Sequence, residues 1–155
     1  MGEEAMIDKL VRVEFDVGGD KVEVMHAKER GDGLFALDNS PLYAYNISYG
    51  DVFSAVDMGP RGLVFCEILE RGGHSTYRVR LRAGEEHPFF LQRWPAMAAL
   101  GCSYEGSGLA DRRLYSIDVP VFTAVPDVYG LLERGEEEEA WEFEEAHYFR
   151  PEGDQ

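Results

Sequence analysis

The first part of the chain alternates between apolar and charged positions in short runs. Residues 9–17 place valine and phenylalanine on one face and charged side chains on the other, which is typical of a strand with one buried face. A turn signal, Gly-Gly-Asp at 18–20, separates this run from a second alternating run at 21–26, so a hairpin is predicted. Turn residues also precede three further apolar runs, which predict strands at 34–37, 52–56 and 63–69. Five short strands with frequent turns favour a small antiparallel barrel or a strongly curled sheet.

The pattern changes after residue 72. Residues 75–82 form an alternating strand with three arginines on one face. Residues 85–100 are rich in helix formers and stop at Gly101, so a helix is predicted, with a kink or restart at Pro95. The other elements expected are a strand at 102–105, a loop at 106–108, a strand at 113–119, a helix opened by Pro126 and Asp127 and running to about Arg134, and a strand at 141–144. The order β-α-β-β-α-β is that of a ferredoxin-like unit.

The predicted fold is therefore α+β. We expect a small antiparallel β-barrel-like half at 1–72, a ferredoxin-like βαββαβ half at 73–149, and a C-terminal tail at 150–155, with the two halves packed as one unit. In a ferredoxin-like sheet the first and last strands are antiparallel neighbours. This arrangement would set Arg78 and Arg80 beside Glu142 and Glu144 and neutralise the arginines within the sheet.

A further turn signal lies between the third and fourth predicted strands. Asp38 and Asn39 have side chains that hydrogen-bond their own backbone in turns, and Pro41 fixes its φ angle. We assign these three residues to a structural turn.

Acidic residues outnumber basic ones by thirty to fifteen, and the net charge is −15. Such a chain repels phosphate backbones and anionic lipid, so neither nucleic acid nor a membrane is expected as a direct partner. The partner expected is a basic protein. The run Glu136-Glu137-Glu138-Glu139 is the densest acidic segment, with a solvated helix end as the alternative interpretation. No apolar run approaches a membrane span, and the N-terminus does not resemble a secretory signal, so we expect a cytoplasmic protein.

The two cysteines, Cys66 and Cys102, lie in apolar surroundings. Two cysteines do not make a disulfide framework, so we interpret both as buried free thiols.

Residues with catalytic or metal-binding chemistry are scattered. His26 ends a predicted strand, His74 lies in a turn, His87 precedes Pro88 and His147 lies in the last strand. No two histidines have the spacing of a zinc-binding helix, and no Cys-x-x-Cys occurs, so no metal or other cofactor is expected. His74 and Ser75 are neighbours on a strand and point to opposite faces, and neither a nucleophile elbow nor a phosphate loop is present. We therefore do not expect an enzyme.

One group of polar residues is not easily assigned to turns or to solvent: Asp51, His74, Tyr77 and Arg78. Turn and edge roles are one interpretation of them. The alternative is a small enzyme or a small-molecule sensor with a cleft between the two halves near these four residues.

Three segments carry a family resemblance: GDGLFALDNSPL at 31–42, GDVF at 50–53 and GHSTYRV at 73–79. In this order and spacing they resemble the bacterial family called domain of unknown function 4265, over roughly residues 10–148. The resemblance implies no established activity. Small bacterial proteins of this kind are associated with polymorphic toxin loci, in which an acidic partner occludes the active site of a toxin.

The first hypothesis is accordingly a non-catalytic immunity protein that neutralises a cationic toxin domain directed at RNA, DNA or nucleotides. Basic clefts of such toxins would accept an acidic loop as a phosphate mimic. A housekeeping scaffold with another basic partner is a further alternative. The residues expected to contact the partner are Glu136, Glu137, Glu138, Glu139, Asp51, His74 and Tyr77.

Overall fold

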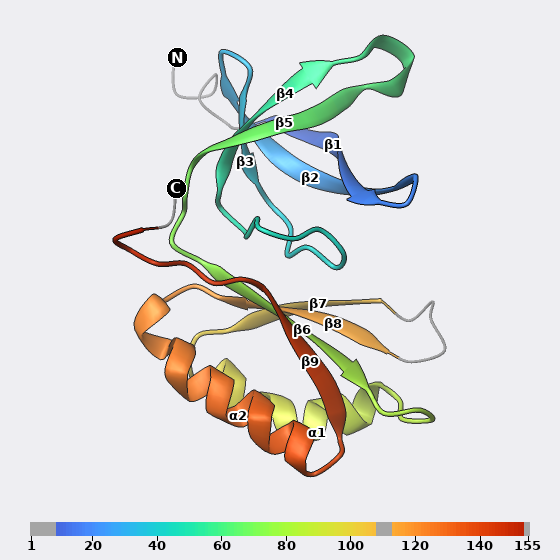
Figure 1. Ribbon diagram of the computed structural model, residues 1–155, viewed down its shortest axis with the longest axis vertical. Helices are drawn as coiled ribbons and strands as arrows, with labels where there is room; N and C mark the ends of the chain where they lie inside the picture. The colour runs from blue at the N-terminus through green and yellow to red at the C-terminus, as the bar shows by residue number, and fades with distance from the viewer. Residues whose placement is uncertain (1–8, 108–112, 154–155) are drawn as a thin grey trace.

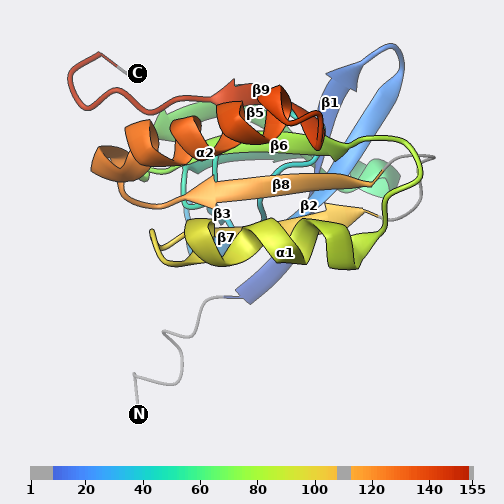
Figure 2. The same ribbon diagram turned by 90° about the horizontal axis from the view of Figure 1, so that it is seen from below.

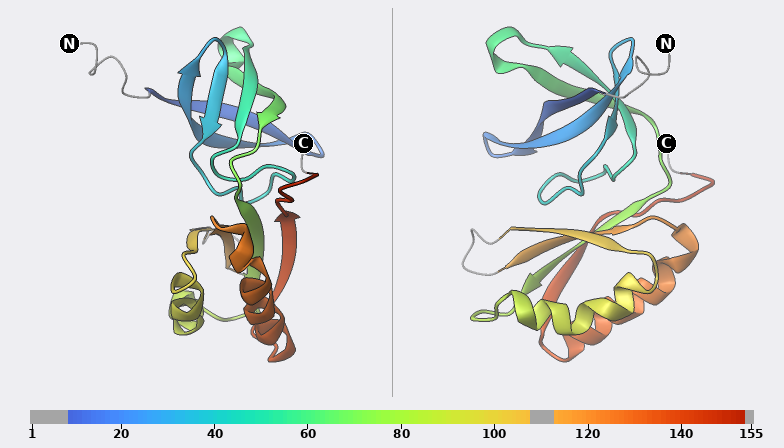
Figure 3. Two further views of the ribbon diagram at one scale, coloured as in Figure 1. Left: turned by 90° about the vertical axis from the view of Figure 1, so that its left-hand side faces the viewer. Right: turned by 180° about the vertical axis from the view of Figure 1, so that it is seen from behind.

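A closed barrel of strands, a four-stranded sheet and a layer of helices make up the part of the protein that the structure describes. The computed structural model describes residues 9–107 and 113–153. Strands β1 to β5 close into a barrel, and the second half of the chain forms a four-stranded sheet whose far face is covered by two helices (Figure 1). The segment between β3 and β4 lies between the barrel and the sheet (Figure 3). The α+β class and the five-stranded barrel predicted from the sequence are confirmed.

The barrel is a simple up-and-down arrangement. Its elements are β1 (Lys9–Gly18), β2 (Lys21–Gly31), β3 (Leu34–Leu37), β4 (Val52–Asp57), a 3₁₀ turn (Gly59–Arg61) and β5 (Leu63–Glu70). Consecutive strands are antiparallel, but the closing pair, β1 and β5, is parallel. The antiparallel pairing predicted for the barrel holds for the consecutive strands and not for this closing pair. With five strands that alternate in direction, the first and the fifth point the same way.

Alternation along the strands fills the barrel interior. Val13 and Phe15 of β1 are buried, as are Met25 and Ala27 of β2. Aromatic rings of Phe15, Phe53 and Phe65 pack against one another inside, with centroids 4.9–5.6 Å apart. The strand β2 continues five residues past His26, which therefore lies inside the strand rather than at its end, because β1 pairs with β2 as far as Glu29.

The second half has the element order expected. It consists of β6 (Ser75–Leu81), α1 (His87–Ala98), β7 (Ser103–Ser107), β8 (Leu114–Val119), a 3₁₀ turn (Phe122–Ala124), α2 (Val125–Glu137) and β9 (Trp141–His147). The strands lie in the order β7-β8-β6-β9, and every neighbouring pair is antiparallel. Both helices lie side by side on one face of this sheet (Figure 2). Pro95 lies within α1.

Two glycines of this half are needed because an aromatic ring lies close to the backbone, and not because they form a turn. Gly106 and Ser107 belong to β7, so the predicted loop at 106–108 was wrong for these two, and Gly108 lies outside the described residues. A Cβ atom on Gly106 would lie 3.0 Å from the Tyr115 ring across the strand pair. On α2, a Cβ atom on Gly135 would lie 2.2 Å from the ring of Trp141, whose indole N–H donates to the carbonyl of Leu132 at 3.0 Å.

The two cysteines differ in exposure. Cys102 is buried, and burial raises the pKa of its thiol to about 11. Cys66 is exposed, so the expectation of two buried thiols was wrong for this residue. Its neighbour Phe65 packs against the barrel core, and adjacent strand residues point to opposite faces.

Candidate functional site

The segment that connects β3 to β4 lies over the face of the sheet that the helices leave open. Residues 41–45 of this segment, which we call the roof loop, are held from both sides. The carboxylate of Glu23 on β2 accepts the backbone N–H groups of Leu42, Tyr43 and Ala44, at 2.8, 3.1 and 2.9 Å. One barrel side chain thus binds three consecutive amides of the roof loop.

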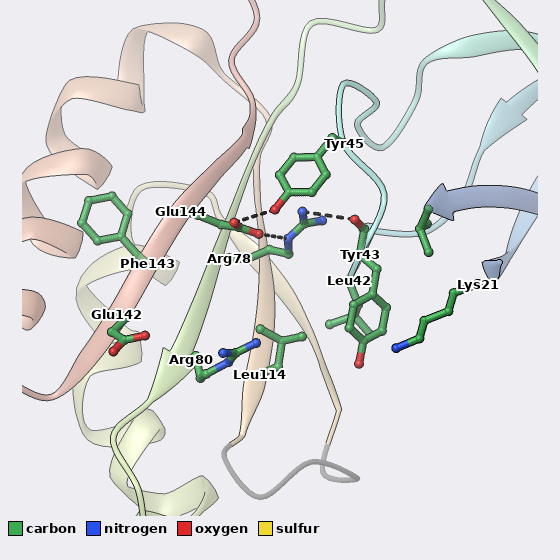
Figure 4. Close-up of a pocket in the computed structure, with 11 residues that line it drawn as sticks. Lys21, Leu42, Tyr43, Tyr45, Arg78, Arg80, Leu114, Glu142, Phe143 and Glu144 are labelled. Atoms are coloured by element: carbon green, nitrogen blue, oxygen red, sulfur yellow. Dashed lines mark hydrogen bonds and ion pairs between the residues drawn. The ribbon is translucent and has the colours of Figure 1, made fainter. Parts of the chain in front are cut away.

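Arg78 holds the carbonyl side of the same loop. Its guanidinium, 2% exposed, donates to the carbonyls of Ala44 at 2.7 Å, Pro41 at 3.3 Å and Tyr43 at 3.3 Å. Its Nε donates to Glu144 at 2.8 Å (Figure 4). Arg78 therefore connects the sheet to the roof loop and fixes the distance between the two halves.

Tyr45 completes this contact. Its ring lies 4.5 Å from the Arg78 guanidinium, and its hydroxyl donates to Glu144 at 2.7 Å. Burial raises the pKa of Glu144, but the hydrogen bonds from Tyr45 and Arg78 outweigh it, and the pKa is lowered from its ordinary value. Glu144 therefore stays ionised at neutral pH.

A cleft of about 440 Å³ opens between the roof loop and the sheet (Figure 4). The β1–β2 hairpin, the roof loop and the strands β6, β8 and β9 all contribute to its wall. The lining residues are Val17, Lys21, Leu42, Tyr43, Tyr45, Arg78, Arg80, Leu114, Glu142, Phe143 and Glu144. A cleft between the two halves is thus present, and Arg78 is the member of the predicted polar group that lines it.

The predicted register of arginines and glutamates is confirmed. Across β6 and β9, Arg78 is the partner of Glu144 and Arg80 is the partner of Glu142. Arg78 is neutralised as expected. Arg80 is exposed, and within residues 9–107 and 113–153 its guanidinium makes no hydrogen bond and no ion pair. Arg78 is thus neutralised through a direct ion pair, whereas Arg80 interacts with Glu144 only through space.

Asp51 holds two segments of the backbone together. Its side chain is fully buried and accepts the N–H groups of Ser48 at 2.9 Å and Gly72 at 2.8 Å and a bond from Arg71 at 2.8 Å. These contacts fasten the end of the β3–β4 segment to the chain that leaves the barrel. A Cβ atom on Gly72 would lie 2.7 Å from the carbonyl oxygen of Gly50, so the two backbones meet closely here.

His74 and Tyr77 lie apart from the cleft. The His74 Nδ1 atom is 2.8 Å from Asp118, and the ring lies 5.4 Å from that of Tyr49. Tyr77, 1% exposed, lies on the helix-covered face, where its hydroxyl donates to Glu145 at 3.1 Å and burial raises its pKa. Since Tyr77 and Arg78 are adjacent in a strand, they point to opposite faces, and the four residues do not form one polar group.

The predicted turn residues make long-range hydrogen bonds rather than bonds to their own backbone. Asn39 accepts the backbone N–H of His26 and donates to Glu105 on β7 at 3.2 Å. Asp38 accepts the hydroxyl of Tyr49 at 3.1 Å, and the carbonyl of Pro41 accepts from Arg78. The turn thus fastens barrel and sheet together.

Sequence reasoning missed several buried contacts between the halves. Ser48 lies 2.6 Å from the hydroxyl of Thr76 and 2.7 Å from Nδ1 of His147, and Ser40 lies 2.7 Å from Ser116. The partners are 28 to 99 residues apart in the chain. No local pattern signals such contacts.

The four consecutive glutamates lie at the C-terminal end of α2. All four, Glu136 to Glu139, are exposed, and Glu138 pairs with Arg93 on α1 at 2.6 Å. They are remote in sequence and in fold from Asp51 and His74, so the residues expected to contact a partner do not form one surface. Among the residues expected to contact a partner, the glutamates alone are exposed.

Two absences apply to the described part of the chain. No helix there has the length and apolar character needed to cross a membrane. Among the same residues, no three His, Cys, Asp or Glu side chains come together as metal ligands would.

The fold defines an α+β protein in which a five-stranded barrel is fastened to a helix-covered four-stranded sheet by the β3–β4 segment. The chain belongs to the family described as Domain of unknown function (DUF4265), whose model matches residues 23–143. Among curated proteins, none matches the sequence.

The chain is also similar to a solved structure described as a novel crystal structure of a hypothetical protein from Neisseria gonorrhoeae. The two sequences are 19% identical, the TM-score is 0.72, and the match covers 93% of this chain and 97% of that one. At this identity the likeness shows a shared fold.

Proposed function

We propose that the protein is a non-catalytic binding protein that uses the glutamates at the end of α2 to contact a basic protein. The partner class that fits best is a cationic toxin domain directed at RNA, DNA or nucleotides, which makes the protein an immunity protein. The observation that carries the proposal is the position of the four exposed glutamates at a helix C-terminus.

This position is unfavourable for folding. The C-terminal end of a helix carries partial negative charge, so carboxylates placed there lower the stability of the helix. The four like charges also repel one another. Glu139 has in addition a left-handed backbone, with φ of 60°. Local departures from favourable helix chemistry are expected at functional sites, and the rest of the fold compensates for their cost. A basic partner would relieve the repulsion on binding and would be attracted from a distance.

A growth-rescue assay tests the proposal. The C-terminal domain encoded by the gene immediately upstream is expressed in a bacterial host, alone and together with this chain. We expect that domain to be basic and to arrest growth alone, and we expect co-expression to restore growth. A harmless upstream domain, or arrest that persists beside the folded chain, would contradict the immunity role.

The contact surface is tested by charge reversal. Glu136→Lys, Glu137→Lys and Glu139→Lys are combined in one variant, and Glu29→Lys, Glu67→Lys and Glu70→Lys, exposed on the barrel, form a control with the same change in charge. Stopped-flow mixing with the upstream domain at low and high salt should show slower association for the α2 variant, most clearly at low salt. Equal slowing by both variants would assign the effect to net charge and exclude a specific contact at α2.

We also assign the second half to the ferredoxin-like class. The order β-α-β-β-α-β and the sheet order β7-β8-β6-β9 support this assignment.

A second candidate function is favoured by the cleft below the roof loop. Its volume lies within the range of small-molecule sites, about 300–1,000 Å³. A small-molecule sensor would use this cleft and would leave the α2 glutamates unoccupied.

A further inference from the structure

Two exposed cations line the cleft. Lys21 and Arg80 are both exposed, and within the described residues neither makes a hydrogen bond or an ion pair. Figure 4 shows their charged groups extending into the cleft from opposite sides, with Tyr43 and Leu114 between them. In a chain with thirty acids and fifteen bases, two cations that face one cleft without an ion pair to another described residue are unexpected, since surface cations have carboxylates available nearby.

The cleft is also preorganised. Glu23 holds the amides of the roof loop and Arg78 holds its carbonyls, so the backbone of Tyr43 is fixed although 48% of the residue is exposed. A ligand that binds beneath this loop does not have to order it, and this lowers the entropic cost of binding. The exposed ring and the side chain of Leu114 supply an apolar surface beside the two cations.

The carboxylates of the cleft set a limit on the ligand. Glu144 is matched by Arg78 and Tyr45 and adds little negative potential. Glu142 lies opposite Arg80 in the strand register, so it opposes a ligand of high negative charge. The arrangement fits a ligand that directs one anionic group toward Lys21 and Arg80 and lays one flat group against Tyr43.

We propose that the cleft binds a small organic anion, in which one carboxylate or phosphate group attached to a flat ring is held by Arg80 and Lys21 and the ring packs on Tyr43. Arg80 presents a planar fork that suits either oxyanion, and Lys21 supplies a point charge. This inference rests on the second candidate function and is independent of the toxin contact.

Amide chemical-shift titrations with phenylacetate, phenyl phosphate and uncharged benzyl alcohol test it at constant ionic strength. We expect saturable shifts of the amides of residues 42–45 and 78–80 with at least one of the two anions and none with the alcohol. Tighter binding of phenylacetate would assign the site to carboxylates, and tighter binding of phenyl phosphate would assign it to phosphate esters. Shifts that fail to saturate with either anion, or equal shifts with the alcohol, would overturn the proposal.

Variants identify the cations involved. Arg80→Gln and Lys21→Gln should each lower the affinity for the anion about tenfold or more, which is the effect of losing one charge-assisted hydrogen bond. Lys28→Gln removes an exposed cation of β2 outside the cleft and should leave the affinity unchanged. The melting temperature reports folding, and it should change little, because neither cleft cation makes a hydrogen bond or an ion pair within the described residues and the through-space attraction between Arg80 and Glu144 is screened by solvent. An affinity that Arg80→Gln leaves intact would overturn the proposal.

Anion binding in the cleft and the toxin contact at α2 can be tested separately. The combined Glu136→Lys, Glu137→Lys and Glu139→Lys variant should bind the anion as the unmodified protein does, because α2 covers the face of the sheet opposite the cleft. Loss of anion binding in this variant would show that the two sites are coupled and would contradict independent function.

Discussion

Arg78 of β6 and Glu144 of β9 face each other across two antiparallel strands, with Nε of the arginine 2.8 Å from the glutamate carboxylate. The pair does more than neutralise two charges. Because the same guanidinium donates to three carbonyls of the roof loop, it joins the sheet to the segment that connects β3 and β4.

Replacement of Arg78 by methionine should therefore destabilise the protein by about 3 kcal/mol, since several hydrogen bonds to a buried charged group are lost at once. Arg80→Met on the same strand is the matched control and should change the free energy of unfolding by less than about 0.5 kcal/mol. Urea denaturation measures both. Equal effects of the two variants would show that Arg78 does not hold the roof loop.

Gly135 should tolerate no side chain. Gly135→Ala places a Cβ atom against the Trp141 ring and should cost about 1–3 kcal/mol, the usual cost of overpacking a buried contact. Gly130→Ala on the same helix meets nothing within 4 Å and should raise stability by about 0.5–1 kcal/mol through helix propensity. Thermal unfolding of the two variants should move in opposite directions. A shift of the same sign in both would mean that the ring moves aside at little cost.

Glu139 ends α2 in a conformation that favours glycine. The N–H of Ala140 bonds to the carbonyl of Gly135 at 2.9 Å and the N–H of Glu139 to that of Glu136 at 3.0 Å, which is a Schellman motif with glutamate in the left-handed position. Glu139→Gly should raise the free energy of unfolding by about 1 kcal/mol. Glu139→Ala removes the charge but keeps the strained backbone, so denaturant curves for the two variants separate the two causes. A stability gain as large in the alanine variant would assign the effect to charge.

Acid should destabilise the protein partly through Glu144. Its pKa is lowered in the folded state from the ordinary 4.5, so its contribution to stability is present above that value. The contribution is lost as the pH falls from about 4.5 through the folded-state pKa, because the unfolded chain binds the proton first. Urea denaturation between pH 7 and pH 3 should show a smaller loss of stability for Glu144→Gln than for the unmodified protein. Parallel curves for the two proteins would contradict this linkage.

The elements themselves could be predicted from the sequence because each depends on local periodicity. Alternation at residues 9–17 and 75–82 predicted that Val13 is buried in the barrel and Val79 in the core between the sheet and the helices. Gly101 marked the end of the first helical segment, where the backbone has a left-handed conformation. The register of Arg78 with Glu144 also followed, because the order of strands and helices restricts which strands are neighbours.

The partners of the polar residues were decided by tertiary structure. Asn39 suggested a local turn, yet its side chain binds Glu105 on β7, and Asp51 is buried against Arg71 rather than exposed. Glu23 carried no signal at all, although it fixes the roof loop and so shapes the cleft. Periodicity determines which face of an element is buried, because burial depends on the side chain and its neighbours in sequence. The partner of a polar group depends on which distant segment the packed fold brings within hydrogen-bond distance, and no local pattern contains that information.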